Sequence, residues 1–137
     1  MRVICRSLKY TTGVVESDAS GSLTEGQEYV VLSIETTAKW GTHYRLLVED
    51  GGDFGLFPST LFEVSDPRLS SRWRCAAEPD GSLSIAPRDW LTPGFWDRYL
   101  GDDPGLPMGQ PDASAYGTFR LEVQALLAED EARSSSG

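Results

Sequence analysis

Ten residues near the middle of the chain, Gly55 to Val64, constrain its fold more than any other stretch. Pro58 cannot donate to a strand ladder, so it ends one strand and sets the φ angle for a turn. Apolar side chains lie on both sides of it. The segment therefore predicts a strand over 54–57, one tight helical turn over 59–61, and a last short strand over 62–64. Such short strands cannot bury their own apolar side chains, so the flanking segments must pack around them.

Three further strands are predicted before this segment. The strongest spans 28–35, where apolar residues are nearly continuous, as in a strand covered on both faces. The others span 3–10 and 43–48. Residues 16–26 read as a loop rich in turn residues, and the consecutive glycines within 49–53 predict a hairpin turn. Five short strands at close spacing predict a small antiparallel barrel over residues 1–65.

The second half has a different pattern. Residues 73–77 and 82–86 predict a hairpin, and 87–91 predict one helical turn. A helix is expected from Pro93 to Leu100, with Thr92 as its N-cap. The segment 101–111 reads as a linker or surface loop. A final helix is predicted from about Ala113 to Glu131 because apolar residues recur along one face; alternation over 118–123 leaves a strand open.

The expected architecture is thus mainly β with α additions: a five-stranded antiparallel barrel followed by a β-hairpin and two helices. Residues 1–65 form the barrel, and residues 66–131 form the appended hairpin and helices. The appended part has too little apolar sequence to stand alone, so we expect it to pack on the barrel as one compact unit. Residues 132–137 are expected to be a disordered tail.

Three segments of the first half resemble the Src-homology-3 family. The residues at 55–59 (GLFPS) look like that family's strand followed by a tight helix. Residues 23–32 (LTEGQEYVVL) look like its polar loop with a glycine before the second strand, and residues 50–52 (DGG) stand where its distal hairpin would be. The resemblance covers roughly Val3 to Val64, and it implies a small barrel of that type.

In that family an aromatic groove binds proline-rich peptides. The resemblance implies that Tyr10 and Pro58 line such a groove. Its tryptophan position falls near His43 or Tyr44, and Thr60 and Leu61 stand where the family continues with Asn and Tyr, so the groove departs from the family pattern. The expected binding face on the barrel comprises Tyr10, Trp40, Tyr44, Pro58 and Leu61.

The charge of the chain limits its partners. A net charge of −9 repels phosphate backbones and anionic lipid, so nucleic acid and membranes are not expected partners. A basic protein would be attracted. No apolar run approaches the length of a membrane span, and the N-terminus lacks a secretory pattern, so a cytoplasmic location is expected. The two cysteines are expected to be reduced thiols there.

Catalytic and metal-binding motifs are not found in the sequence, and no cofactor is expected. His43 is the only histidine, and two distant cysteines do not complete a zinc site. The sequence has no glycine-rich phosphate loop and no nucleophile motif. The assignment is therefore a binding protein rather than an enzyme, although a small enzyme without a recognisable motif remains an alternative.

Aromatic residues interleaved with arginines mark the second half. Such a cluster is either a second small core or an exposed patch that binds another protein, because aromatic residues and Arg are enriched at interface centres. Trp90 and Trp96 are the candidate partner-binding residues here. We expect a cytoplasmic, bacterial binding module for another protein; an acidic immunity or antitoxin-like protein that neutralises a basic toxin is the alternative. The cluster comprises Arg72, Trp73, Arg74, Arg88, Trp90, Phe95, Trp96, Arg98 and Tyr99.

Overall fold

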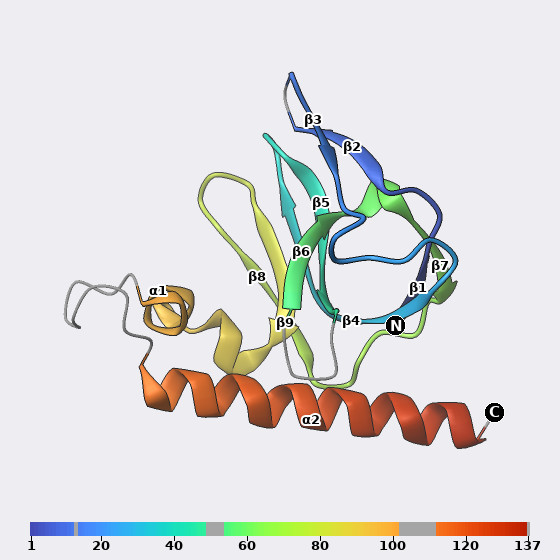
Figure 1. The fold of residues 1–137 in the computed structure, drawn as a ribbon. Coiled ribbons are helices and arrows are strands. Elements are labelled where there is room, and N and C mark those ends of the chain that lie inside the picture. The colour runs from blue at the N-terminus through green and yellow to red at the C-terminus, as the bar shows by residue number, and fades with distance from the viewer. Residues whose placement is uncertain (13, 49–53, 102–111, 137) are drawn as a thin grey trace.

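The computed structural model describes residues 1–12, 14–48, 54–101 and 112–136. The fold is mainly β, with antiparallel sheets followed by two helices at the C-terminal end (Figure 1). The predicted hairpin turn over 49–53 and most of the predicted loop over 101–111 lie outside the described residues. The elements are β1 (Arg2–Cys5), β2 (Lys9–Thr12), β3 (Val15–Asp18), β4 (Glu28–Thr37), β5 (Gly41–Leu47), β6 (Phe54–Pro58), η1 (Ser59–Leu61), β7 (Phe62–Asp66), β8 (Trp73–Ala77), β9 (Leu83–Pro87), η2 (Arg88–Leu91), α1 (Phe95–Leu100) and α2 (Ala113–Ser136).

Strand β4 organises the main sheet. It pairs with β5 over most of its length, with β1 at residues 28–30 and with β9 at residues 34–36. Between these last two pairings, the indole nitrogen of Trp73 donates a 3.0 Å hydrogen bond to the carbonyl of Leu32. The side chain thus satisfies a buried backbone acceptor that neither β1 nor β9 reaches. A long strand with this many partners explains the nearly continuous apolar run in its sequence.

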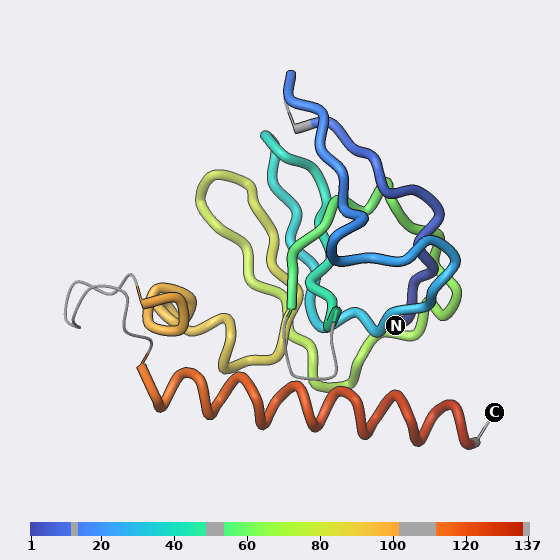
Figure 2. Tube along the Cα trace, in the orientation of Figure 1, coloured from blue at the N-terminus to red at the C-terminus, as the bar shows by residue number. Residues whose placement is uncertain are grey.

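The remaining strands extend the sheet in both directions. The order is β6-β5-β4-β1-β7, with β9 and then β8 attached at β4, and in the described chain the path ends at β6 and β7 without closing. The segment predicted as one strand over 3–10 is split into β1 and β2. The predicted loop over 16–26 begins within β3, whose one strand partner in the described chain is β2, and this hairpin projects away from α2 (Figure 2).

The strand, turn and strand predicted around Pro58 are confirmed as β6, η1 and β7. A Cβ added at Gly55 would lie 2.6 Å from the Phe57 ring, so a larger residue at that position would require the ring to move. Leu61 is buried, and its carbonyl accepts hydrogen bonds from the backbone N–H groups of Arg6 and Ser7 at 2.8 and 3.2 Å. The turn therefore holds the link between β1 and β2 as well as joining its own two strands.

The hairpin and short helix of the second half are confirmed as β8–β9 and α1, but the predicted N-cap is wrong. Thr92 ends η2 in an extended conformation, and its carbonyl accepts a hydrogen bond from the N–H of Phe95 at 3.0 Å. Gly94 has φ 78° and ψ 0° and occupies the N-cap position. These are the angles of the third residue of a type II turn, with Pro93 before it. The Thr-Pro-Gly sequence therefore makes a turn first, and α1 begins after it.

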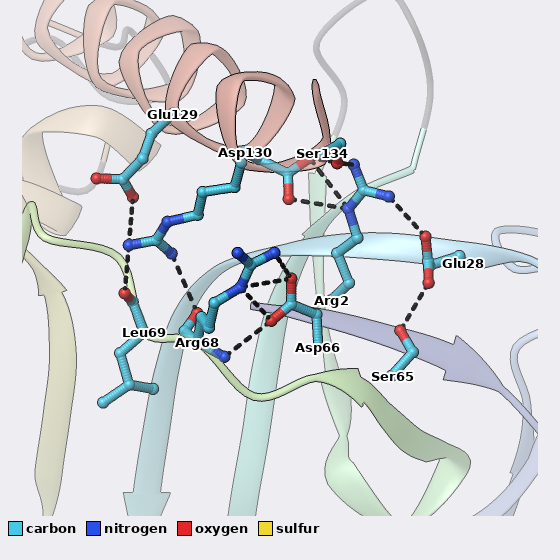
Figure 3. A network of polar contacts seen from close by, with 10 residues as sticks. Arg2, Glu28, Ser65, Asp66, Arg68, Leu69, Glu129, Asp130 and Ser134 are labelled. Atoms are coloured by element: carbon cyan, nitrogen blue, oxygen red, sulfur yellow. Dashed lines mark hydrogen bonds and ion pairs between the residues drawn. The ribbon is translucent and has the colours of Figure 1, made fainter. Parts of the chain in front are cut away.

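Helix α2 runs along the end of the molecule opposite the β2–β3 hairpin (Figure 1). The helical alternative for residues 118–123 is correct, and the helix continues past Glu131 through most of the segment expected to be a disordered tail. Arg2 fixes this end: its guanidinium donates to Asp130 at 2.7 Å, to Ser134 at 2.5 Å and to Glu28 at 2.9 Å. Figure 3 shows this network joining α2 to β1 and to the segment after β7.

The apolar core is continuous between the two halves. Phe119 of α2 lies at the centre of an aromatic cluster, with ring centroids 4.7 Å from Phe54, 4.9 Å from Trp90 and 4.7 Å from Tyr99. Phe119 is 2% exposed and Trp90 is 1% exposed. Because strand residues and helix residues share these contacts, the appended half completes the core.

Candidate functional site

A pocket of about 190 Å³ opens where η2 and α1 pack against strands β4, β5, β8 and β9. We call it the Arg45 pocket. Its walls combine a sheet surface with the turn that precedes α1, so its shape depends on the type II turn and the β8–β9 hairpin. The lining residues are Ser33, Glu35, Arg45, Ala76, Glu78, Ser84, Ala86, Trp90, Leu91, Thr92, Pro93, Gly94, Phe95, Trp96 and Asp97.

Arg45 is the central side chain of this pocket. Arg45 is 7% exposed, which is unusually low for an arginine. One terminal nitrogen donates to Ser33 Oγ at 2.9 Å and to Glu35 Oε1 at 3.2 Å. The guanidinium carbon lies 3.9 Å from the centre of the Trp96 ring, a cation–π contact. Burial lowers the pKa of Arg45 from its ordinary value, while the charge of Glu35 opposes that shift.

Carboxylates outnumber this cation in the pocket. Glu35 bonds Arg45 through one oxygen, and Glu78 and Asp97 add two further carboxylates at the walls. Both are exposed, and neither has an ion-pair partner among the residues that the structure describes. With Arg45 already bound to Glu35, the accessible charge of the pocket is negative. Trp96, Phe95 and Trp90 supply its aromatic surface.

Two hydrogen-bond donors at this pocket are buried without an acceptor. They are Nε of Arg45 and Nε1 of Trp90, and the described part of the chain supplies no partner for either. An unsatisfied buried donor costs about 1–3 kcal/mol of stability. A purely structural core would be expected to avoid this cost, so the combination of a buried cation and two unpaired donors marks the region as a candidate functional site.

The structure separates the predicted binding residues into two groups. Tyr10, Tyr44 and Pro58 are half-buried near η1, where β2 and β5 both contact that turn. Leu61 of η1 is 1% exposed, so a partner docking on this conformation would not contact its side chain. Trp40 lies at the β4–β5 turn, 49% exposed, with Lys39 Nζ 4.7 Å from its ring centre.

The other two predicted residues lie together in the Arg45 pocket. Trp90 and Trp96 have ring centroids 5.7 Å apart, with Trp90 buried and Trp96 half-buried. Trp90 therefore belongs to the core, and Trp96 lies between the core and the pocket. Arg45 and Glu35 were not singled out from the sequence. The sequence signal that could have indicated Arg45 was a charged residue among apolar neighbours in the strand predicted at 43–48.

The two cysteines and His43 do not cluster with other reactive or metal-binding side chains in the described part of the chain. Cys5 is buried, and burial raises the pKa of its thiol, whereas Cys75 is exposed on β8. His43 is half-buried on β5, in register with Glu35 and Pro58. Within the described ranges no three His, Cys, Asp or Glu side chains are arranged to hold a metal ion. Among the same residues, neither helix is both long and apolar enough to span a bilayer.

Comparison with known proteins adds no family to these observations. No family model, curated protein or solved structure matches this chain.

Proposed function

We propose that this chain is a non-enzymatic, cytoplasmic protein-binding module and that its Arg45 pocket receives a basic side chain of a protein partner. The observation that carries the proposal is the surplus of carboxylates over cations beside an aromatic wall. Glu78 and Asp97 offer unpaired acceptors, and Trp96 offers a ring surface against which the stem of a Lys or Arg side chain can pack.

The size of the pocket supports a side chain rather than a whole ligand. Pockets that bind small molecules and cofactors measure roughly 300–1,000 Å³. The Arg45 pocket measures about 190 Å³. One long side chain fills such a space, with the rest of the partner lying on the surrounding surface.

Arg45 has a positioning role in this proposal. Its hydrogen bond fixes Glu35, and its guanidinium fixes the ring of Trp96 from one side. A buried arginine also repels a competing cation from the inner end, so the incoming charge stays near Glu78 and Asp97 at the mouth. The pocket thus selects a basic side chain of limited reach.

The charge of the whole chain supports a basic partner. A net charge of −9 attracts a positively charged protein over a distance of about one Debye length, roughly 8 Å at physiological salt, and accelerates their encounter. An acidic immunity or antitoxin-like protein that neutralises a basic toxin would use the same surface. The net charge of −9 therefore favours the immunity or antitoxin-like form of this proposal.

The barrel remains part of the proposal. Strands β1, β4, β5, β6 and β7 would form a variant of the Src-homology-3-like barrel, with β8 and β9 added at β4. The strand order and the 3-10 turn after Pro58 support this reading. A proline-peptide groove is less well supported, because Leu61 is buried.

The test is an NMR titration with Nα-acetyl-arginine methylamide, using the citrulline analogue as an uncharged isostere. We expect the arginine compound alone to shift the side-chain N–H signal of Trp96, and Glu78→Gln combined with Asp97→Asn to abolish the shift. Glu63→Gln, an exposed carboxylate on β7, serves as the matched control. Equal shifts from arginine and citrulline, or full binding by the double variant, would contradict the proposal.

A further inference from the structure

We propose that the chain has a second binding site, specific for a single phosphate-type oxyanion. It is a surface depression of about 390 Å³ where β8, η2 and α2 meet. We call it the arginine depression. It shares no residue with the Arg45 pocket, so this proposal stands apart from the one above. Its lining residues are Ser71, Arg72, Arg74, Arg88, Asp89 and Glu122.

The β8–β9 hairpin and the 3-10 turn that follows it bring the three arginines together. Arg74 lies on β8, and Arg72 directly precedes that strand. Arg88 begins η2, directly after β9 ends at Pro87, and Pro87 pairs with Trp73 at the start of β8. Because side chains alternate along a strand, Trp73 is buried while Arg72 and Arg74 are exposed. The three arginines therefore line one depression.

Two of these three cations have no carboxylate partner in the described chain. Arg72 is neutralised by Glu122, with two hydrogen bonds of 2.8 and 2.9 Å. Arg74 instead donates to the backbone carbonyls of Ser71 and Trp73, at 3.2 and 2.8 Å. These carbonyls orient the guanidinium without cancelling its charge. Arg88 makes no ion pair with any described residue.

Like charges that line one depression repel one another, and a bound anion relieves that repulsion. The guanidinium fork matches the oxygens of a phosphate group, which can accept parallel hydrogen bonds from Arg74 and Arg88. The carboxylates that line the depression limit the length and charge of the anion that can bind. Asp89 and Glu122 line the same depression and would repel a long polyanion, as would the net charge of −9. The site therefore fits one oxyanion and not a nucleic-acid backbone.

The test is isothermal titration of the full-length protein with inorganic phosphate at constant ionic strength, with chloride as the balancing salt. We expect saturable phosphate binding. Arg74→Gln and Arg88→Gln should each weaken it at least about tenfold, because each substitution removes one charge-assisted hydrogen-bonding group. Arg6→Gln is the matched control, because Arg6 is an exposed arginine elsewhere, paired with Glu63. Equal phosphate affinity in the Arg88→Gln and Arg6→Gln proteins would overturn the proposal.

A second variant gives the opposite effect and cannot be mimicked by misfolding. Glu122→Gln frees Arg72, so we expect tighter phosphate binding. Glycerol phosphate distinguishes the source of the oxyanion: binding at least as tight as that of inorganic phosphate indicates an organic phosphate monoester. Tighter binding of duplex DNA than of either phosphate would overturn the assignment to a single oxyanion, as would unchanged affinity in Glu122→Gln.

Discussion

The buried residues Trp73 and Trp90 differ in the hydrogen bonding of their indole N–H groups. Trp73 donates to the Leu32 carbonyl at 3.0 Å, whereas the N–H of Trp90 has no partner among the described residues. The residues are 7% and 1% exposed, so the two rings are similarly removed from water. The more deeply buried ring is therefore the one with the unsatisfied donor.

The substitution of each tryptophan by phenylalanine tests this difference. Trp73→Phe removes the indole donor to the Leu32 carbonyl, and Trp90→Phe removes a donor that has no acceptor among the described residues. Both lose similar ring volume. We expect Trp73→Phe to lower the free energy of unfolding by about 1–3 kcal/mol more than Trp90→Phe does, measured by urea denaturation. Equal losses would show that Trp90 Nε1 has an acceptor after all.

Residue by residue, the sequence indicated the aromatic members of the candidate site but not its charged ones. Trp90 and Trp96 are conspicuous because tryptophan is rare and large. Arg45 is surrounded by apolar residues in a strand, and the sequence does not reveal that its side chain points into the molecule. A register shift in β4 between Val31 and Ser33 places Ser33 opposite Arg45. Such a shift depends on the pairing of two strands, so no local pattern encodes it.

At the scale of elements, α2 is held by different forces along its length. Its first part buries apolar residues such as Phe119 and Val123. Its last part is held by polar contacts. Glu129 accepts hydrogen bonds from Ser71. Arg133 donates to the Leu69 carbonyl at 3.0 Å, a contact drawn in Figure 3. The apolar periodicity predicted the first part correctly. The last turns depend on partners far away in the sequence, which explains why they were expected to be disordered.

The contribution of Glu129 should depend on pH. Burial raises the pKa of its carboxyl, but hydrogen bonds from Ser71 and Ser70 and the charge of Arg133 outweigh this, so the pKa lies below its ordinary value of 4.5. A lowered folded-state pKa stabilises the protein above the unfolded-state pKa, and the effect is lost as pH falls through the folded-state value.

We therefore expect Glu129→Gln to be less stable than wild type at about pH 6, with the difference shrinking as the pH falls below about 4. Urea denaturation across this range measures it. Glu131→Gln, an exposed carboxylate on the same helix, is the control and should show little change at either pH. A difference that stays constant with pH would mean that the Glu129 charge is not involved.

At the scale of the whole molecule, the two halves share one hydrophobic core. β4 pairs with β9, and Phe54 of β6 packs on Phe119 and Tyr99. A protein consisting of residues 1–66 alone would lose these contacts and expose part of its apolar interior. We expect such a fragment to lack a cooperative unfolding transition, while the full chain unfolds in one step. A cooperative transition in the fragment, seen by far-ultraviolet circular dichroism, would show an independent domain.

The general architecture was accessible from the sequence because short apolar runs and turn residues are local signals. The strand, turn and strand around Pro58 and both helices were located in this way. The β2–β3 hairpin was not, because Val15 to Asp18 contains mostly polar, exposed residues and has no strand partner besides β2 among the described residues. The attachment of β9 at β4 was also hidden, since it joins segments about fifty residues apart. The sequence showed the neighbours within the β8–β9 hairpin but not the pairing of strands that lie far apart along the chain.

The contact between Arg2 and Asp130 joins residues 128 positions apart. Synthesis runs from the N-terminus to the C-terminus, so the ribosome makes β1 well before its partner on α2. Strand β1 can pair with β4 and β7 earlier, but the Arg2 guanidinium has no Asp130 to bind until α2 has been made. Long-range contacts of this kind delay folding. Strand β1 therefore remains incompletely anchored until α2 has been made.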